Sequence, residues 1–408
     1  MGRPVLRAVE VGRGLSAQLV GAVRAALEGA GPAVLPIPAD APEPIRDALR
    51  AALRPDDPGA PLEVDDVALV VPTSGSTGEP KGALLTRAAV RASVDATAAR
   101  LSGPGAWVLA MPSTHVAGLM VLARALLSGG EPVVLGGERF EPTMFVAATT
   151  EAAAAAHQSG RPLYVSLVPT QLERLLAAGV DLSAYDAILL GAAAAAAELL
   201  DRARDAGAHV VTTYGMTETC GGCVYDGRPL DGVTVRVEAT AGAAVEGAGP
   251  GRVLLGGPTL AAGYRLRPDL TAESFVAGWF RTGDVGRWDG ARLTLDGRLD
   301  DVVVTGGENV VPGVVERSLA QVAGADAQWC VVGVADDEWG QRVVAVLAAD
   351  DEVPTPDVTA VRDGLRDALP AAWLPREVVR VRELPMLASG KVDRVAVAGL
   401  VAAEVSRP

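Results

Sequence analysis

A run rich in glycine and hydroxyl residues directly follows an apolar stretch in the first fifth of the chain. Residues 73–82 read Thr-Ser-Gly-Ser-Thr-Gly-Glu-Pro-Lys-Gly, and residues 67–71 before them read Val-Ala-Leu-Val-Val. Backbone N–H groups and hydroxyls in such a loop can surround phosphate oxygens, and a lysine adds positive charge. The run is not a Walker A loop, because Lys81 is followed by glycine rather than serine or threonine. A polyphosphate cradle is therefore one interpretation, and a Gly/Ser linker is the other.

A second polar run, residues 212–219, lies at the end of another predicted strand and reads Thr-Thr-Tyr-Gly-Met-Thr-Glu-Thr. Ligands of open α/β sheets bind beyond the carboxyl ends of the strands. Tyr214 offers a flat ring for stacking on a purine, Thr217 a hydroxyl for a phosphate oxygen, and Glu218 a hard carboxylate for Mg²⁺. Without the other motifs, a purely structural interpretation is equally compatible with the run: Tyr214 would lie in a turn and Glu218 would be solvated.

Further polar runs occur in the C-terminal half. Residues 279–284 read Trp-Phe-Arg-Thr-Gly-Asp, residues 297–301 read Gly-Arg-Leu-Asp-Asp, and residues 385–394 read Pro-Met-Leu-Ala-Ser-Gly-Lys-Val-Asp-Arg. An aspartate after glycine is usually a turn residue, because its side chain bonds the local backbone. A lysine in a glycine-containing loop is by default a solvated charge. Each run therefore also has a purely structural interpretation.

In this order and at this spacing, the motifs resemble those of the adenylate-forming superfamily, the acyl-CoA synthetases and their relatives, over residues 67–395. The resemblance implies an enzyme that activates a carboxylic acid with ATP and Mg²⁺ and uses coenzyme A as co-substrate. It assigns Glu218 to the metal, and Lys391, Glu218 and Thr217 to catalysis. The implied nucleotide-binding residues are Thr73, Ser74, Gly75, Ser76, Thr77, Gly78, Lys81, Gly191, Ala192, Ala193, Tyr214, Gly215, Met216, Thr217, Asp284, Arg298 and Lys391.

The resemblance also distributes roles among the later residues. The backbone of residues 191–193 is implied to line the adenine, Asp284 to bind the two ribose hydroxyls, and Arg298 to make a second contact there. Asp300 corresponds to a hinge between a large and a small domain.

The small domain is implied to serve two half-reactions. Lys391 acts in adenylation, whereas Gly306 and Gly307 act when CoA attacks. Because one surface cannot obviously present both at once, the small domain is expected to rotate about Asp300 between two closed states.

Three segments narrow the implied acid. Residues 111–118, 166–172 and 214–230 resemble o-succinylbenzoate–CoA ligases of menaquinone biosynthesis, in their compact actinobacterial forms. Such ligases often carry two histidines where this chain has Thr114 and His115, so only His115 is carried over. The implied acyl-binding residues are His115, Ser166, Gly215, Cys220 and Gly221.

The expected reaction is formation of an acyl-adenylate with release of pyrophosphate, followed by displacement of AMP by the CoA thiolate. No side-chain nucleophile is required, and no Ser-His-Asp arrangement is evident. Three alternatives stay open: another acyl- or aryl-CoA ligase, a stand-alone adenylation enzyme that feeds a carrier protein, and a catalytically silent nucleotide-binding protein.

The pair Cys220 and Cys223 invites a zinc or redox interpretation. A structural zinc site needs four ligands, and neither Cys330 nor the three histidines shows ligand spacing with the pair. A redox dithiol needs a helix N-terminus and an electropositive setting. Small residues that let the chain pass close to the acyl substrate are the preferred interpretation.

The elements that must position these motifs follow from the apolar periodicity. Alternation of short apolar runs with helical stretches indicates βαβ units and largely parallel sheets. The predicted strands lie at residues 67–71, 107–111, 132–135, 163–167, 187–190 and 210–213. The predicted helices lie at residues 86–101, 116–127, 142–156, 170–178 and 193–206.

The predicted fold is α/β, with a large domain at residues 1–299 and a hinged small α+β domain at residues 300–408 that carries the catalytic lysine. The large AMP-binding domain has mainly parallel sheets flanked by helices. It includes a small antiparallel β subdomain at residues 230–299. Only 66 residues precede the first motif strand, which predicts a trimmed N-terminal part.

Composition restricts the partners of this chain of 408 residues. The net charge is −14, which disfavours nucleic acid and anionic membranes. The apolar segment at residues 107–127 contains Pro112, His115 and Arg124, so it does not predict a membrane span. Three cysteines and no apolar leader predict a cytoplasmic protein with reduced thiols. The expected ligands are a small carboxylic acid, ATP and CoA, and a homodimer is compatible with the sequence.

Overall fold

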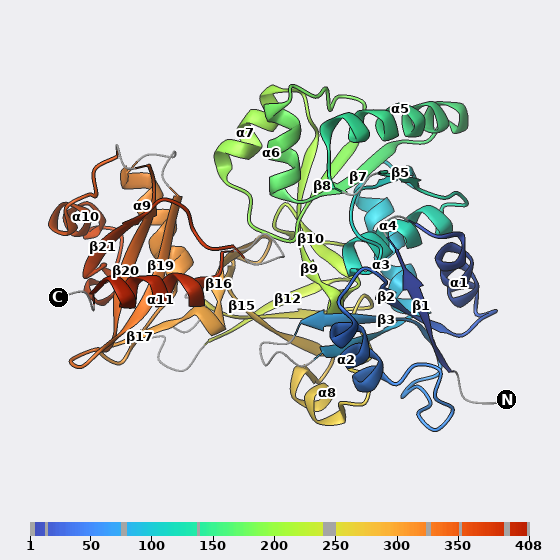
Figure 1. Cartoon of the computed structure of the whole chain (residues 1–408), viewed down its shortest axis with the longest axis horizontal. Coiled ribbons are helices and arrows are strands. Elements are labelled where there is room, and N and C mark those ends of the chain that lie inside the picture. Colours follow the sequence, from blue (N-terminus) through green and yellow to red (C-terminus); the bar gives the residue numbers. More distant parts are fainter. Residues whose placement is uncertain are drawn as a thin grey trace. The chain divides into compact units, whose positions relative to one another are not determined.

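The computed structural model describes residues 5–12, 15–74, 80–136, 139–239, 250–323, 328–350, 353–386 and 392–405 (Figure 1). Contacts divide the chain into two compact units. The first comprises Met1–Val235 and Leu255–Arg281, and the second Arg236–Leu254 and Thr282–Pro408. Residues 282–299 therefore belong to the same unit as the C-terminal residues. The motifs instead predict a domain boundary with a hinge at Asp300, and this hinge stays a prediction.

The first sheet of the first unit has the strand order β1-β2-β3-β4. Its strands are β1 (Leu6–Val11), β2 (Ala33–Pro38), β3 (Val67–Ser74) and β4 (Pro80–Thr86). β1, β2 and β3 are parallel, and β4 pairs antiparallel with β3. This hairpin places the predicted strand at residues 67–71 in a different sheet from the later predicted strands. The polar run at residues 73–82 connects the two arms of the hairpin.

The second sheet carries the βαβ units that the sequence predicts. Its order is β11-β10-β9-β8-β7-β5-β6. The strands are β5 (Ala106–Leu109), β6 (Val133–Val134), β7 (Leu163–Leu167), β8 (Ala187–Leu190), β9 (Val210–Met216), β10 (Gly221–Tyr225) and β11 (Arg228–Pro229). β5 to β9 are mutually parallel where they pair, and β10 turns back antiparallel to β9. The parallel prediction is confirmed.

Helices cover these two sheets (Figure 1). They are α1 (Ala17–Glu28), α2 (Glu43–Leu53), α3 (Arg87–Arg100), α4 (Val116–Leu127), α5 (Pro142–Ser159), α6 (Pro169–Ala177) and α7 (Ala197–Asp205), followed by the short 3₁₀ turn η1 (Thr217–Thr219). One core joins strands β5, β7 and β8 to α5, α6 and α7, and another joins α1, α3 and α4 to the first sheet. Local chemistry sets helix starts, since the hydroxyls of Ser16 and Thr86 accept bonds from the amides of Leu19 and Ala89.

A third sheet has the order β12-β13-β15-β14, with β16 paired to β15. The elements are β12 (Thr234–Ala239), β13 (Gly251–Gly256), α8 (Pro268–Ser274), β14 (Phe275–Val276), β15 (Trp279–Trp288) and β16 (Leu293–Arg298). β15 pairs antiparallel with both β14 and β16, as the predicted subdomain requires.

The C-terminal residues form a fourth sheet with the order β18-β17-β20-β19 and β21 beside β20. The elements are η2 (Leu299–Asp301), β17 (Val303–Thr305), β18 (Glu308–Val310), α9 (Pro312–Ala323), β19 (Gln328–Asp336), β20 (Gly340–Ala348), α10 (Val358–Leu365), η3 (Ala371–Trp373), β21 (Glu377–Val381) and α11 (Arg394–Val405). Two separate apolar clusters cover this sheet, one with α9 and α10 and one with α11. No helix among the described residues is long and apolar enough to cross a membrane.

Candidate active site

Two paired residues of the β3–β4 hairpin flank the glycine- and hydroxyl-rich segment. Thr73 in β3 lies opposite Lys81 in β4, and Ser74 is the last residue of β3. Thr73 Oγ1 is buried and has no hydrogen-bond partner among the described residues. An unsatisfied buried hydroxyl costs about 1–3 kcal/mol, so a ligand oxygen at this position would be stabilised. The predicted phosphate-binding residues between them, Gly75, Ser76, Thr77 and Gly78, lie outside the described residues.

Predicted adenine and acyl residues come together at one edge of the second sheet. Ser166, Gly191 and Tyr214 lie at or just beyond the carboxyl ends of β7, β8 and β9. The register joins these ends, because Leu167 pairs with Leu190 and the amide of Gly191 donates to the carbonyl of Leu167 at 3.1 Å. Ala192 and Ala193 continue the same loop. The edge is where open α/β sheets bind their ligands.

Gly215 in β9 must be glycine, because a Cβ there would lie 2.1 Å from the carbonyl oxygen of Gly221. The chain therefore doubles back on itself at close range between β9 and β10. Thr219 closes this turn: its hydroxyl accepts from the amide of Met216 at 3.0 Å and lies 2.7 Å from the carbonyl oxygen of Gly221. The turn holds Thr217 in a buried position within η1.

Glu218, the predicted metal ligand, is held by a residue that the motifs do not contain. The Tyr264 hydroxyl donates to Glu218 Oε1 at 2.7 Å, and only 7% of Glu218 and 2% of Tyr264 are exposed. Lys81 Nζ lies 3.5 Å from the same hydroxyl and 4.6 Å from the ring centroid of Tyr264. Burial and the adjacent Glu218 carboxylate raise the pKa of Tyr264, so the phenol stays a protonated donor.

Sequence analysis missed Tyr264 because no local signal marks it. It lies 46 residues after Glu218 and 183 after Lys81, between a glycine and an arginine in a region predicted only as β-rich. The three residues meet because the segment around Tyr264 runs along β4, where Ala83 and Tyr264 form an isolated antiparallel bridge.

The donor set around Glu218 fits Mg²⁺ bound with a nucleotide. Mg²⁺ prefers oxygen ligands and is commonly held by one or two carboxylates together with substrate phosphates. Glu218 supplies one buried carboxylate, and Tyr264 donates to its Oε1, which leaves the carboxylate lone pairs for a cation. Within the described ranges, no three histidine, cysteine, aspartate or glutamate side chains are grouped so as to hold a metal.

His115, the predicted acyl-binding histidine, directly precedes α4. Its side chain is exposed, and Nδ1 lies 3.3 Å from Thr114 Oγ1. Partial desolvation by the surrounding chain nevertheless lowers the pKa of His115, which favours a neutral imidazole at pH 7. A neutral imidazole can still donate one hydrogen bond to a carboxylate.

Cys220 and Cys223 are both completely buried, and both are free thiols. Cys220 belongs to the same buried apolar cluster as Met120, its amide donates to the carbonyl of Thr217, and its carbonyl accepts from the Ser93 hydroxyl. Burial raises the pKa of Cys223 to about 12 and shifts that of Cys220 in the same direction. Reactive cysteines have lowered pKa values, so this environment does not favour thiolate chemistry.

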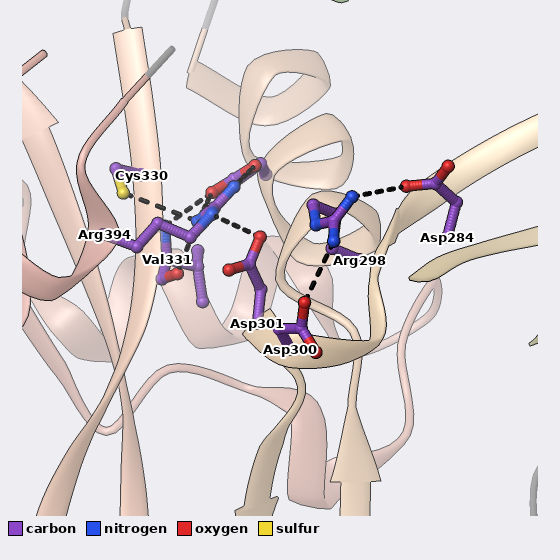
Figure 2. Close-up of polar contacts among 8 residues, drawn as sticks. Asp284, Arg298, Asp300, Asp301, Cys330, Val331 and Arg394 are labelled. Carbon is purple, nitrogen blue, oxygen red and sulfur yellow. Dashed lines mark hydrogen bonds and ion pairs between the residues drawn. The ribbon is translucent and has the colours of Figure 1, made fainter. Parts of the chain in front are cut away.

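The predicted ribose and hinge residues are joined in the second unit. Asp284 and Arg298 are opposite each other across β15 and β16, and Arg298 donates to Asp284 Oδ1 at 3.2 Å. The same guanidinium donates to Asp300 Oδ2 at 2.9 Å (Figure 2). Gly306 and Gly307, the predicted CoA-step residues, form the turn between β17 and β18 with φ angles of 56° and 83°.

Lys391, the predicted catalytic lysine, lies outside the described residues, but the chain just after it is firmly anchored. Arg394 begins α11 and donates to both carboxylate oxygens of Glu316 at 2.6 and 3.0 Å. It also donates to the carbonyl of Val331 at 2.7 Å, and its Nε lies 3.3 Å from Asp301 Oδ2 (Figure 2). The start of α11 is therefore joined to Asp301, the residue that follows the predicted hinge.

Comparison with known protein families gives two matches. Residues 18–265 match the model described as AMP-binding enzyme, and residues 315–391 match the AMP-binding enzyme C-terminal domain. The first range contains the β3–β4 loop and Glu218, and the second ends at Lys391.

Individual relatives extend over most of the chain. A Mycobacterium tuberculosis protein named probable 2-succinylbenzoate–CoA ligase is 42% identical over 98% of this chain and 100% of its own length. A feruloyl-CoA synthase from Amycolatopsis is 33% identical over 82% of this chain and 70% of its own. The solved structure of E. coli MenE with a bound analogue of OSB-AMS has a TM-score of 0.74 and 27% identity, and covers 98% of this chain and 89% of its own.

Proposed function

This chain belongs to the AMP-binding enzyme family, and from that premise we propose that it converts o-succinylbenzoate to o-succinylbenzoyl-CoA in menaquinone biosynthesis. ATP and the acid form an acyl-adenylate with release of pyrophosphate, and the CoA thiolate then displaces AMP. The observation that carries the proposal is the match at 42% identity to a probable 2-succinylbenzoate–CoA ligase over 98% of this chain and 100% of that protein.

The residues of the first unit supply the nucleotide-binding part of this reaction. Thr73 offers a hydroxyl that has no partner among the described residues, and Lys81 offers a cation, at the two ends of the loop that is proposed to cradle the polyphosphate. Tyr214 and the backbone of residues 191–193 are proposed to line the adenine. A carboxylate is a poor electrophile, so these contacts must hold the α-phosphorus close to the acid.

The reaction also requires positive charge that offsets the negative charge of the phosphates. When bound with ATP, Mg²⁺ supplies Lewis acidity at the phosphates, and Glu218 is proposed to hold it. Lys391 is proposed to offset the negative charge that develops on the α-phosphate during attack. Asp284 and Arg298 are proposed to bind the ribose hydroxyls, which fixes the nucleotide from the sugar side.

Another aryl-CoA ligase is the second candidate function. The match to a feruloyl-CoA synthase over 82% of this chain favours it, because ferulate is also an aromatic carboxylic acid. The two candidate functions differ in what the acyl-binding site must recognise, because o-succinylbenzoate carries a second carboxylate on the ring.

The substrate proposal predicts that o-succinylbenzoate is the preferred acid by kcat/KM. Its aromatic carboxylate is a second charge that needs a partner in the site, whereas benzoate, ferulate and octanoate have only the carboxylate that is activated. Pyrophosphate release measured over this panel, with and without CoA, checks the prediction. A higher kcat/KM for ferulate or octanoate would transfer the assignment to another acyl- or aryl-CoA ligase.

His115→Ala is expected to lower kcat/KM for o-succinylbenzoate about 30-fold. Losing one partner of a charge in a binding site costs about 2–5 kcal/mol, and the lower value applies because His115 is partly solvated. The comparison substrate is 4-oxo-4-phenylbutanoate, which lacks the aromatic carboxylate and should lose little. His157→Ala, an exposed histidine of α5, is the matched control variant. Equal losses on both substrates would remove His115 from recognition of the second carboxylate.

We also infer a cytoplasmic location, which fits three free cysteines and substrates of the cytoplasmic pools. A homodimer is compatible with this proposal, and sedimentation analysis of the purified chain tests it.

A further inference from the structure

Tyr264 connects two residues of the proposed active site through its hydroxyl. The direction of this chain of hydrogen bonds is fixed by chemistry, because a lysine ammonium only donates and a carboxylate only accepts. Lys81 therefore donates to the phenol oxygen at 3.5 Å, and the phenol donates to Glu218 Oε1 at 2.7 Å. We propose that Tyr264 is a positioning residue for divalent-cation binding, which fixes the orientation of the Glu218 carboxylate.

The backbone around Tyr264 is held on one side by α8. The amide of Tyr264 donates to Thr271 Oγ1 at 2.9 Å, and the ring meets Phe275 edge-on at a centroid distance of 5.7 Å. Gly263 has a φ of 137°, and a Cβ there would lie 2.5 Å from Thr271 Cγ2. Only glycine at position 263 therefore lets the chain pass this close to Thr271, and this contact fixes the backbone next to Tyr264.

On the other side, Arg265 anchors the same segment. Its side chain is completely buried and donates to the backbone carbonyls of Leu53 at 3.2 Å and Pro61 at 2.6 Å, and to Glu63. Because both neighbours of Tyr264 are fixed, its hydroxyl is a rigid donor. A rigid partner of a metal ligand fixes the orientation of that ligand.

A phenol suits this role better than a charged partner would. An arginine beside Glu218 would neutralise the carboxylate and compete with the cation, whereas a neutral phenol fixes one oxygen and leaves the negative charge.

Lys81 also stands out in composition: the chain has 36 lysine and arginine residues, and only Lys81 and Lys391 are lysines. The compact ammonium of Lys81 lies over the Tyr264 ring and within 3.5 Å of the hydroxyl, and an arginine would not be a conservative replacement there.

The test is Tyr264→Phe, which removes one oxygen atom and keeps the ring that packs on Phe275. The readout is Mn²⁺ binding in the presence of a non-hydrolysable ATP analogue. The electron paramagnetic resonance signal of free Mn²⁺ measures this binding. We expect the Mn²⁺ dissociation constant to rise about tenfold or more, the scale for lost outer partners of metal ligands. Binding of the analogue in EDTA should be unchanged.

Tyr185→Phe is the matched control, because Tyr185 is equally buried in the same unit and its hydroxyl lies 2.7 Å from Thr149 Oγ1. It should reduce thermal stability to a similar degree and leave Mn²⁺ binding as in the wild type. A Mn²⁺ dissociation constant within twofold of wild type for Tyr264→Phe would overturn the proposal. Equal changes in both phenylalanine variants would overturn it as well.

A double variant shows whether Tyr264 acts through Glu218. In a Glu218→Gln background, Tyr264→Phe should change Mn²⁺ binding less than twofold further, whereas additive losses would contradict the positioning role. This inference rests on the proposed ligase function, yet the two can fail separately. If no acid yields a CoA ester while Mn²⁺ binding responds as expected, the ligase proposal fails and Tyr264 keeps its role.

Discussion

Lys391→Ala is expected to slow formation of the acyl-adenylate about 10²–10³-fold. The proposed role of Lys391 is one charge contact that strengthens as negative charge develops on the α-phosphate, and loss of such a contact has this magnitude. Formation of the CoA ester from chemically prepared acyl-adenylate should be almost unchanged, because Gly306 and Gly307 are proposed to serve that half-reaction. Single-turnover measurement of each half-reaction separates the two.

The second half-reaction is thus the internal control for folding of the variant. Lys391→Arg adds a second control: it keeps the charge but changes a compact ammonium to a planar fork, so we expect only partial recovery. Equal losses in both half-reactions would contradict the proposal that the two steps use different surfaces. Lys391 would then be a residue required for the integrity of the small domain.

Glu218→Gln is expected to reduce adenylation by about two orders of magnitude or more. The amide keeps the shape of the side chain and can still accept from Tyr264, but it lacks the charge that holds Mg²⁺ beside the phosphates. Raising the Mg²⁺ concentration should restore part of the rate, since the defect lies in metal occupancy. Pyrophosphate release measured against Mg²⁺ concentration checks both expectations.

Glu173→Gln provides the matched control for this variant. Glu173 pairs with Arg202 at the surface of the same unit, and such exposed pairs contribute little to stability. Its rate and its Mg²⁺ dependence should equal those of the wild type. A Glu218→Gln enzyme with normal activity at limiting Mg²⁺ would rule out Glu218 as the metal ligand.

Much of the second sheet could be predicted because its signals are local. The sequence predicts strands at residues 163–167 and 187–190, and these form β7 and β8 with the same bounds. Buried parallel strands are continuous apolar runs, and the helices between them repeat apolar residues every three to four positions, so a short window of sequence reports both. The placement of Ser166, Gly191 and Tyr214 at one sheet edge then follows from the rule that parallel strands share their carboxyl ends.

Pairing between distant segments could not be predicted in the same way. Residues 67–71 carry the apolar run of a parallel strand, yet β3 also forms an antiparallel hairpin with β4 and lies in another sheet. Likewise, Arg298 contacts Asp284 only because the register of β15 and β16 sets these two residues opposite each other. Register depends on which side chains fit together across strands, and a local window contains only one of the two partners.

The types of the reactive groups were therefore determined by the sequence alone: a loop of glycines and hydroxyls, a carboxylate at position 218 and lysines at 81 and 391. Tertiary structure decided how Glu218 is held. Its donor, Tyr264, comes from a segment 46 residues away that pairs with β4 and is fixed by Arg265 and Gly263. A single hydrogen bond between two buried side chains leaves no periodicity in the sequence, so only the packed chain brings its donor and acceptor together.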